Sequence, residues 1–304
     1  MRIVRTKAEL RAELEPARRA ARTIGLVPTM GALHNGHLSL LDAARERCDV
    51  VVISLFVNPA QFGPDEDLDT YPRDEARDAE LAAAHGADLL YAPEADEVYR
   101  EGFATAVEVT GALTEVLDGD PQRRGSGHFR GVTTVVAKLF AAVGPDVAFF
   151  GQKDAQQAIV IRRMARDLDF PVEIEVLPTV READGLALSS RNAYLDDEDR
   201  RRATALHRAL AAAEHAVAAG TTSVAEVLAA ARKELEAESI EAEYLEAREA
   251  EGLELMHSFD GRPVLVAVAA RVGPARLIDN VVIGGEGGHA RLPSEGDNQC
   301  RDRC

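Results

Sequence analysis

Short apolar runs alternate with helical patterns through the first part of the chain, up to about residue 184. The candidate strands are Ile24–Pro28, Val50–Val57, Asp88–Tyr91, Asp146–Phe150 and Val172–Leu177. The candidate helices are His37–Arg47, Arg73–His85, Thr133–Val143 and Ala155–Asp167. Strands that alternate with helices favour a parallel sheet covered on both faces. Ligands of such sheets bind beyond the carboxyl ends of the strands, so the loops there are the first places to search for chemistry.

A different pattern begins near residue 185. Two Ala-rich helical stretches, Asp197–Ala219 and Ser223–Glu238, come before three strand-like runs. These runs are Glu243–Ala247, Val264–Arg271 and Arg276–Ile283, and the turn signal Gly273-Pro274 predicts a hairpin between the last two. We therefore expect an α/β protein with a Rossmann-like parallel sheet over 1–184 and a smaller α+β domain over 185–284. Residues 285–304 are Gly-rich and polar, which predicts a disordered tail.

Composition narrows the class of protein further. The 304 residues carry a formal net charge of −17, so a diffuse basic surface for nucleic acid is not expected. No apolar run approaches the ~20 residues of a membrane span. The first residues, Met1–Leu10, are charged throughout and lack the apolar region of a signal peptide, so we expect a cytoplasmic location. Three cysteines, Cys48, Cys300 and Cys304, do not make a disulfide framework.

The segment Val27–His37, VPTMGALHNGH, is the most informative motif. It follows a strand, turns at Gly31 and enters a helix with His34 and His37 at its start. Unpaired N–H groups and a partial positive charge at a helix N-terminus attract phosphate, and two imidazoles one turn apart can donate to phosphate oxygens. The alternative is that two surface histidines cap a helix, because short motifs give false positives.

The second strand ends in a polar loop that contains Asn58 and Gln61. Both side chains are amides, with donors and acceptors that suit the hydroxyls and carboxylate of a small polar substrate. Ordinary turn chemistry around Asn58-Pro59 is the favoured explanation when this loop is taken alone. Farther along, His128 and Arg130 follow a glycine-rich loop. They could face an anionic ligand or cap a helix, and the sequence does not separate these alternatives.

Phe149–Gln157, FFGQKDAQQ, is again a strand, a turn and a helix. Gly151 permits the turn, and Asp154 is a candidate N-cap. Lys153 then stands at a helix N-terminus, where a lone lysine has no structural purpose but a phosphate ligand gives it one. Gln157 lies one turn along and is expected to face the same crevice.

The segment Val180–Asn192, VREADGLALSSRN, completes the set of motifs. The adjacent hydroxyls of Ser189 and Ser190, followed by Arg191, can grip a polyphosphate, because a guanidinium binds two oxygens at once. An ordinary Ser-rich turn before a helix is the alternative.

Taken together, these four motifs resemble the pantoate–β-alanine ligase family, in order and over nearly the whole chain, from Leu26 to about Ile283. The H-x-G-H motif alone implies only the wider nucleotidyltransferase superfamily. Two positions depart from the family pattern, which often has Glu at Gln152 and Met at Leu188. Both replacements are close in size, and neither removes a charged phosphate ligand.

The resemblance implies an ATP-dependent ligase that acts in two steps in coenzyme A precursor biosynthesis. The carboxylate of (R)-pantoate attacks the α-phosphorus of ATP to give pantoyl adenylate and pyrophosphate, and the amine of β-alanine then displaces AMP to give pantothenate. The resemblance also implies a homodimer and Mg²⁺ held largely by the nucleotide, without dedicated metal ligands from the protein. Asp78 is a candidate for assisting the metal through water. Because the adenylate hydrolyses easily, we expect the second domain to close over it.

The resemblance assigns roles to residues at the matching positions. The catalytic residues it implies are His37 as proton donor, His34, Lys153 and Arg191. The ATP site it implies comprises Met30, Gly31, His34, His37, Gly151, Lys153, Asp154, Val180, Leu188, Ser189, Ser190 and Arg191. The pantoate pocket it implies comprises Met30, Gln61 and Gln157, with Gln61 also binding β-alanine.

Two rival functions remain at this point. An adenylyltransferase with the same histidine motif would need a basic subsite for a phosphorylated acceptor, whereas the second loop offers Asn58 and Gln61. A non-catalytic nucleotide-binding module would tolerate the loss of a histidine or of Lys153, yet all are present.

Overall fold

The computed structural model describes residues 1–63, 66–284 and 292. Contacts divide the chain into two compact units. The first unit comprises Met1–Gly151 and Gln156–Leu177, and the second comprises Gln152–Ala155 and the described residues from Pro178 onward. This division lies at Leu177, earlier than the domain boundary that the sequence predicted after residue 184. It also assigns the short segment that carries Lys153 to the second unit.

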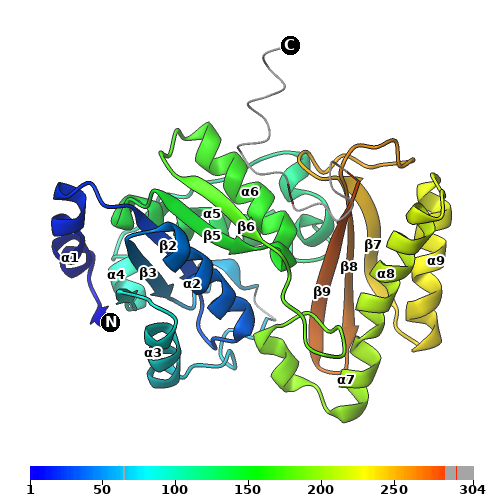
Figure 1. The fold of residues 1–304 in the computed structure, drawn as a ribbon, viewed down its shortest axis with the longest axis horizontal. Helices are drawn as coiled ribbons and strands as arrows, with labels where there is room; N and C mark the ends of the chain where they lie inside the picture. Colours follow the sequence, from blue (N-terminus) through cyan, green and yellow to red (C-terminus); the bar gives the residue numbers. More distant parts are fainter. Residues whose placement is uncertain (64–65, 285–291, 293–304) are drawn as a thin grey trace. The chain divides into compact units, whose positions relative to one another are not determined.

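A six-stranded sheet forms the centre of the first unit (Figure 1). The strand order is β1-β4-β3-β2-β5-β6, and every neighbouring pair is parallel. The strands are β1 (Arg2–Val4), β2 (Ile24–Thr29), β3 (Val50–Leu55), β4 (Leu89–Tyr91), β5 (Val147–Gly151) and β6 (Glu173–Leu177). The predicted parallel α/β sheet is therefore confirmed.

Helices connect these strands. They are α1 (Lys7–Arg19), α2 (Asn35–Arg47), α3 (Glu75–Ala84), α4 (Ala95–Val98), α5 (Ser126–Val143) and α6 (Ala155–Asp167). The described 3-10 helices of the first unit are η1 (Pro59–Gln61), η2 (Ala112–Thr114) and η3 (Leu117–Gly119). Helix α2 packs on β2, β3 and β5 and also contacts α3, whereas α5 contacts α1 and β2. Right-handed crossovers put α2 and α3 on one face of the sheet and α1, α5 and α6 on the other.

The central strands β2 and β3 are nearly continuous apolar runs because both faces of the sheet are covered. They pair in register from Ile24 opposite Val50 to Thr29 opposite Leu55. Their side chains join one hydrophobic core with those of α2, including the fully buried Leu41, Val51 and Ile53.

The strand order reverses direction between β2 and β5. The chain moves from β2 outward through β3 to β4, and then returns to lay β5 on the other side of β2. Such a switch point opens a crevice beyond the carboxyl ends of the two strands, where ligands of doubly wound sheets bind. The loop after β2 carries the two histidines, and Lys153 follows β5 in the sequence.

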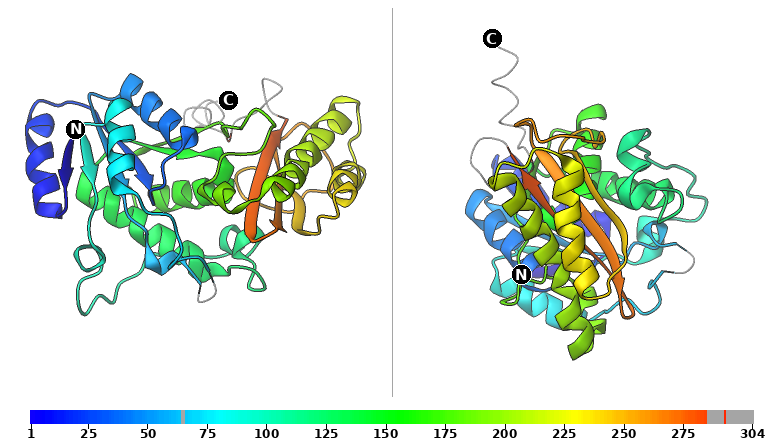
Figure 2. Two further views of the ribbon diagram at one scale, coloured as in Figure 1. Left: turned by 90° about the horizontal axis from the view of Figure 1, so that it is seen from below. Right: turned by 90° about the vertical axis from the view of Figure 1, so that its right-hand side faces the viewer.

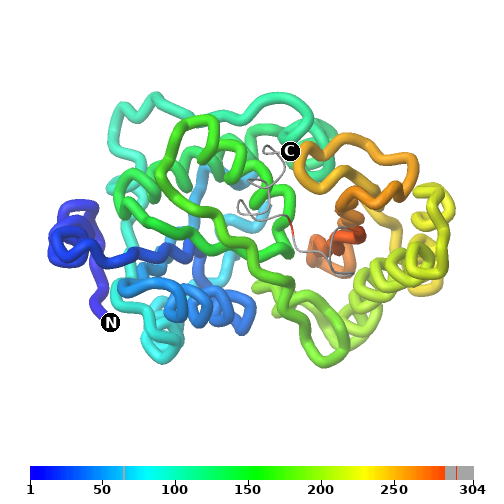
Figure 3. Tube along the Cα trace, turned by 45° about the horizontal axis from the view of Figure 1, so that its top comes forward, coloured from blue at the N-terminus to red at the C-terminus, as the bar shows by residue number. Residues whose placement is uncertain are grey.

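Helix α5 approaches η1 closely at Gly131. A side chain at this position would put its Cβ 2.1 Å from the carbonyl oxygen of Ala60, so only glycine fits here. The long connection from β4 to α5 can be followed in Figure 3, in cyan to green, and its extended part is tied to α5. Thr134 Oγ1 accepts the backbone N–H of Val107 at 3.0 Å.

The second unit contains a three-stranded antiparallel sheet in the order β7-β8-β9 (Figure 2). Its strands are β7 (Ala242–Glu249), β8 (Val264–Val272) and β9 (Ala275–Ile283), and its helices are α7 (Asp197–Ala203), α8 (Ala205–Ala218) and α9 (Val224–Ala237). Helix α8 packs on β8 and β9, and α9 packs on β7. Small side chains such as Ala209, Ala213 and Ala231 let the helices approach each other and the sheet, and they are fully buried. The predicted hairpin at Gly273-Pro274 joins β8 to β9.

Several element boundaries differ from the prediction. Strand β1 and helix α1 were not predicted, and α5 begins at Ser126 rather than at Thr133. The long helix predicted over Asp197–Ala219 is two helices, α7 and α8, which meet at Thr204, where Oγ1 donates to the carbonyl oxygen of Arg201 at 2.7 Å. The predicted tail over 285–304 lies outside the described residues except for Leu292, as do Cys300 and Cys304, whereas Cys48 is a buried free thiol.

None of the helices in the described part of the chain is long and apolar enough to cross a membrane.

Gly131→Ala is expected to lower the free energy of unfolding by about 1–3 kcal/mol, because the added methyl group meets the Ala60 carbonyl. Gly127→Ala is the matched control on the same helix, since nothing lies within 4 Å of its Cβ position. It should be neutral or stabilising by up to about 1 kcal/mol through helix propensity. Urea unfolding measures both, and equal stabilities of the two variants would contradict the close contact.

Candidate active site

The loop after β2 is held by a buried carboxylate. Asp78 on α3 is 1% exposed, and its two oxygens accept the backbone N–H groups of Ala32 and Leu33, each at 2.8 Å. Gly31 enters this loop with φ of +96°, a conformation that glycine adopts without strain. The aspartate thus fixes the backbone directly before the two histidines. Sequence reasoning had considered Asp78 as an assistant to a metal, but both its oxygens are engaged by the protein.

His34 and His37 cap the N-terminus of α2 reciprocally. His34 is the N-cap residue, and its Nδ1 accepts the N–H of Gly36 at 3.2 Å. The Nδ1 of His37 accepts the backbone N–H of His34 at 3.4 Å, and the ring centroids lie 4.1 Å apart. A ring that accepts at Nδ1 carries its proton on Nε2, where it is a donor. Capping and ligand binding, which the sequence offered as alternatives, are therefore compatible, because they use different ring nitrogens.

The electrostatics of this helix end favour an anion. The first turn of α2 carries backbone N–H groups and a partial positive charge, and no acidic side chain lies in it. Gly36 adds no side chain at this point, and its N–H is capped by His34. Backbone dipole and two imidazole donors together can stabilise negative charge that develops on phosphate oxygens.

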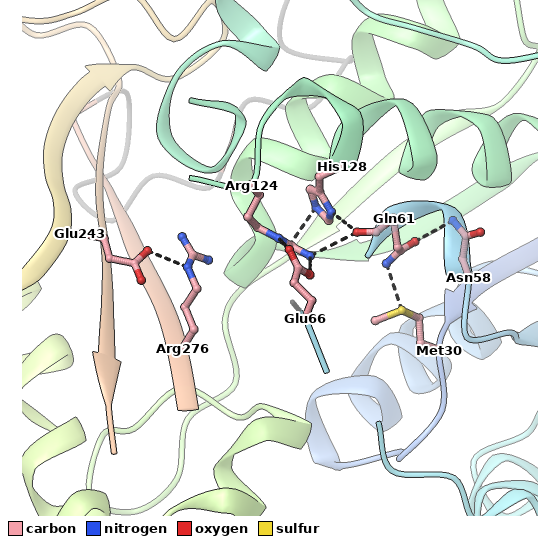
Figure 4. A network of polar contacts seen from close by, with 8 residues as sticks. All are labelled: Met30, Asn58, Gln61, Glu66, Arg124, His128, Glu243 and Arg276. Atoms are coloured by element: carbon pink, nitrogen blue, oxygen red, sulfur yellow. Dashed lines mark hydrogen bonds and ion pairs between the residues drawn. The ribbon is translucent and has the colours of Figure 1, made fainter. Parts of the chain in front are cut away.

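The loop after β3 presents an oriented pair of amides. Asn58 is 1% exposed, and its Nδ2 donates to the backbone carbonyl of Gly131 and to Oε1 of Gln61, both at 3.1 Å. Gln61 in turn directs its Nε2 to the sulfur of Met30 at 3.0 Å. Met30 and Gln61, which were predicted to line one pocket, are thus in contact (Figure 4).

A second set of contacts grips the backbone of Gln61 from α5. His128 donates from Nδ1 to the carbonyl oxygen of Gln61 at 2.8 Å, and its Nε2 accepts from Arg124 at 3.0 Å. Arg124 is held by Glu66 through two hydrogen bonds of 2.9 and 2.6 Å. Figure 4 shows Gln61 between His128 and Asn58. His128 therefore faces the protein rather than forming a helix cap, and its hydrogen bonds require a neutral ring.

Burial is the main cause that lowers the pKa of His128 from 6.5 to about 4, and the charge of Arg124 adds to it. The hydrogen bonds of the ring explain why the pKa of His128 is lowered, because a proton on Nε2 would point at the guanidinium of Arg124, which is itself a donor.

Two glutamines begin α6, and they differ in role. Gln156 is buried, with Nε2 donating to the carbonyls of Leu113 and Val116 at 2.9 and 2.8 Å. Gln157 is only partly buried. Gly151, at the end of β5, precedes this helix, and no atom lies within 4 Å of its Cβ position.

In the second unit, Lys153 and Asp154 lie in a 3-10 turn, η4 (Gln152–Asp154), directly before α6. Asn280 on β9, which is 4% exposed, fixes this turn: its Nδ2 donates to the carbonyls of Gln152 and Lys153, both at 2.9 Å. The Lys153 ammonium lies 3.6 Å from the Asp154 carboxylate. A cation on a fixed turn before a helix is the arrangement that the sequence predicted for a phosphate ligand.

The remaining predicted residues lie on a small hairpin and the turn after it. The N–H of Leu188 donates to the carbonyl of Val180 at 3.0 Å, which closes the hairpin. The next residue, Arg181, forms two hydrogen bonds of 2.6 and 3.0 Å with the buried Asp279. Ser189 then caps η5 (Ser190–Tyr194), because its Oγ accepts the N–H of Arg191 at 3.3 Å. Ser189, Ser190 and Arg191 thus form one tight turn.

Sequence reasoning missed the residues that hold the predicted ones. Asp279 and Asn280 stood in a predicted strand. Tyr99, whose hydroxyl donates to Oδ1 of Asn58 at 2.7 Å, lay in a stretch to which no role was given. The available signal was a run of polar side chains, Asp279-Asn280, inside an otherwise apolar strand. In the described part of the chain, no cluster of three His, Cys, Asp or Glu residues suits a metal ion.

Comparison with known proteins identifies the class. The family model for pantoate–β-alanine ligase matches residues 2–282. A pantothenate synthetase of Moorella thermoacetica is 54% identical over 93% of this chain and 99% of its own length. The crystal structure of pantothenate synthetase from Thermus thermophilus matches with a TM-score of 0.86 and 50% identity, over 92% of this chain and 99% of that chain.

A further match is the pantoate–β-alanine ligase of Francisella tularensis, which was crystallised with beta-gamma ATP and β-alanine. Its TM-score is 0.76 and its identity 30%, over 92% of this chain and 97% of that chain. The protein is therefore a carbon–nitrogen ligase. It belongs to the pantoate–β-alanine ligase family, which joins pantoate to β-alanine, and the resemblance drawn from the four motifs is confirmed.

The pKa of His128 leads to a prediction about acid stability. In the native state the ring stays neutral down to about pH 4, whereas in the unfolded chain it binds a proton below about pH 6.5. Stability is therefore lost as the pH falls from about 6.5 to 4, and this group should remove about 2 kcal/mol between pH 7 and pH 5.

Urea unfolding of the parent and of His128→Gln at both pH values measures this loss. The variant should lose less stability than the parent by that amount, since the other titrating groups are common to both. The same pH dependence in the two proteins would contradict a buried neutral His128.

Proposed function

We propose that the enzyme activates pantoate with ATP as pantoyl adenylate. An oxygen of the pantoate carboxylate forms a bond to the α-phosphorus, the bond between the α-phosphorus and its bridging oxygen breaks, and pyrophosphate leaves. The amine of β-alanine then forms the amide bond at the acyl carbon, loses a proton, and AMP leaves with the carboxylate oxygen. The products are pantothenate, AMP and pyrophosphate.

The reciprocally capped histidine pair is the observation that carries this proposal. His34 and His37 stand at the N-terminus of α2, each accepting a backbone N–H at Nδ1, so their Nε2 donors are set before any ligand arrives. The first step gathers negative charge on phosphate oxygens and on the leaving pyrophosphate. Fixed donors stabilise that charge without reorganising, and His37 can supply a proton to the leaving group.

The acid substrate is proposed to bind between the loops after β2 and β3, in contact with Met30, Gln61 and Gln157. The contact of Gln61 Nε2 with the Met30 sulfur supports this, because a thioether is a weak acceptor that a carboxylate or hydroxyl oxygen can replace. The neutral amide environment suits a small hydroxy acid better than a phosphorylated acceptor. Gln61 is also the proposed contact for β-alanine.

The second unit is proposed to supply the cations and the adenosine site. Lys153, Ser189, Ser190 and Arg191 would hold phosphates, and Asp154, Leu188 and Val180 would complete the nucleotide site. Met30, Gly31 and Gly151, which belong to the first unit, are also proposed to contact the nucleotide. The support is that hydrogen bonds from the buried Asn280 fix the turn of Lys153 and that Ser189 caps the turn of Arg191, so the backbone that carries both charges is preorganised.

Mg²⁺ bound to the phosphates would supply further charge neutralisation when it is present. We expect the nucleotide itself to hold most of the ion's ligands, and each oxygen of Asp78 already accepts one backbone N–H. We also propose a homodimer by family resemblance, which sedimentation equilibrium would test, and a cytoplasmic location, which cell fractionation would test.

His37→Ala should lower the rate of pyrophosphate release from ATP and pantoate about 10²–10³-fold, because a preorganised donor is lost. The assay omits β-alanine, so it reports the first step alone, as a single-turnover burst. His215→Ala, an exposed histidine on α8, is the control and should keep the full rate. A burst of normal rate in His37→Ala would exclude its proposed role.

Lys153→Met should lower the rate of pyrophosphate release by a similar factor, because the charge that stabilises the phosphates is lost, and the melting temperature should stay unchanged. Lys233→Met removes an exposed lysine from α9 and is the control variant, which should keep the parent rate. Pyrophosphate release that does not depend on pantoate, in the parent enzyme, would refute the assignment of the acid substrate.

A further inference from the structure

Gln61 can face a substrate in two ways, and they differ chemically. Its amide offers either an NH₂ donor or a carbonyl acceptor, and only the donor suits a carboxylate. Since the two ends of an amide have nearly the same shape, packing alone does not choose between them. The hydrogen-bond partners of the opposite end must make that choice.

Asn58 is that partner, and its own orientation is set by groups that cannot change roles. Its Nδ2 donates to the carbonyl of Gly131, which can only accept, at 3.1 Å. Its Oδ1 accepts the N–H of Ala60, which can only donate, at 3.3 Å. Consequently the second hydrogen of Nδ2 must meet Oε1 of Gln61, at 3.1 Å, and Nε2 of Gln61 is turned away from Asn58.

The shortest of the bonds that fix Asn58 comes from Tyr99. The phenol of Tyr99, at the end of α4, donates to Oδ1 of Asn58 at 2.7 Å, a shorter bond than that from Ala60. The ring is held by neighbours, with Phe103 in an edge contact at 5.1 Å between centroids and Phe56 at 6.3 Å. Burial raises the pKa of Tyr99 to about 12, so the hydroxyl remains a donor throughout the ordinary pH range.

We propose that Tyr99 is a positioning residue which, through Asn58, holds the Gln61 amide with its NH₂ group presented to the acid substrate. The hydrogen bonds run in one direction, from the Tyr99 hydroxyl to Asn58 Oδ1, and from Asn58 Nδ2 to Gln61 Oε1. The last donor of this series of hydrogen bonds, Nε2 of Gln61, contacts the Met30 sulfur and can exchange that partner for an oxygen of the acid. The inference rests on the proposed role of Gln61 in binding pantoate.

Tyr99→Phe removes one hydroxyl and keeps the ring contacts. Without it, Oδ1 of Asn58 retains only the longer bond from Ala60, so states with a reversed Gln61 amide become populated. We expect the KM for pantoate to rise about fivefold, the effect of losing one ordinary hydrogen bond, while the KM for ATP stays unchanged. The assay is pantoate-dependent pyrophosphate release at saturating β-alanine, so that the enzyme turns over and both KM values can be measured.

Tyr91→Phe is the matched control. Tyr91 on β4 is a buried tyrosine whose phenol also has a pKa raised to about 12 by burial, but it takes no part in the hydrogen bonds of Asn58. It should leave both KM values as in the parent. A purely structural role of Tyr99 would lower the melting temperature, with no selective change in the KM for pantoate.

A double-mutant cycle separates this inference from the proposed function. If Gln61→Ala leaves the KM for pantoate unchanged, the proposed pantoate site is wrong. If Gln61→Ala raises it but Tyr99→Phe does not, the positioning role alone is overturned. If each single variant raises the KM for pantoate, Tyr99→Phe should cause no further rise in the Gln61→Ala background. Additive effects on this KM would show that Tyr99 acts by another route and would overturn the inference.

Discussion

The parallel pairing of β2 and β3 is the constraint on which the site depends. Because both strands are buried and run in the same direction, their carboxyl ends meet at one edge of the sheet. The loop with the two histidines and the loop with Asn58 and Gln61 therefore emerge side by side, as the contact of Gln61 with Met30 shows. The strand order reverses between β2 and β5, and ligands of doubly wound sheets bind at such a point.

Strand ends bring the loops together, but buried polar contacts give each loop its shape. Asp78 fixes the backbone before the histidines, and His128 fixes the carbonyl of Gln61. Asn280 does the same for the turn that carries Lys153. In each case the holding group is buried and comes from a distant part of the chain, so removing it leaves unsatisfied backbone groups. The groups proposed to contact substrate are thereby held in place by folding, so binding need not pay the entropy of ordering them.

Much of this was predictable from the sequence, because local signals decide it. Apolar runs, turn glycines and the histidine motif identified the parallel sheet, the helix that begins near His34 and the polar loops at strand ends. Strand β1, only three residues long, and the early start of α5 were missed, since short edges and glycine-rich helix starts carry weak periodicity. Asn280 was missed and Asp78 was given another role for a different reason. Their contacts join segments far apart in the sequence, and one sequence alone does not show which distant residues pair.

The central claim is that pantoate is activated as an adenylate, and an isotope label tests it most directly. Pantoate with ¹⁸O in both carboxylate oxygens would be converted to pantothenate with ATP and β-alanine, and the nucleotide product analysed by mass spectrometry. Attack of the carboxylate on the α-phosphorus requires that one labelled oxygen per turnover appears in AMP. Unlabelled AMP, or label in inorganic phosphate or pyrophosphate instead, would contradict an acyl-adenylate and point to a different activated acid.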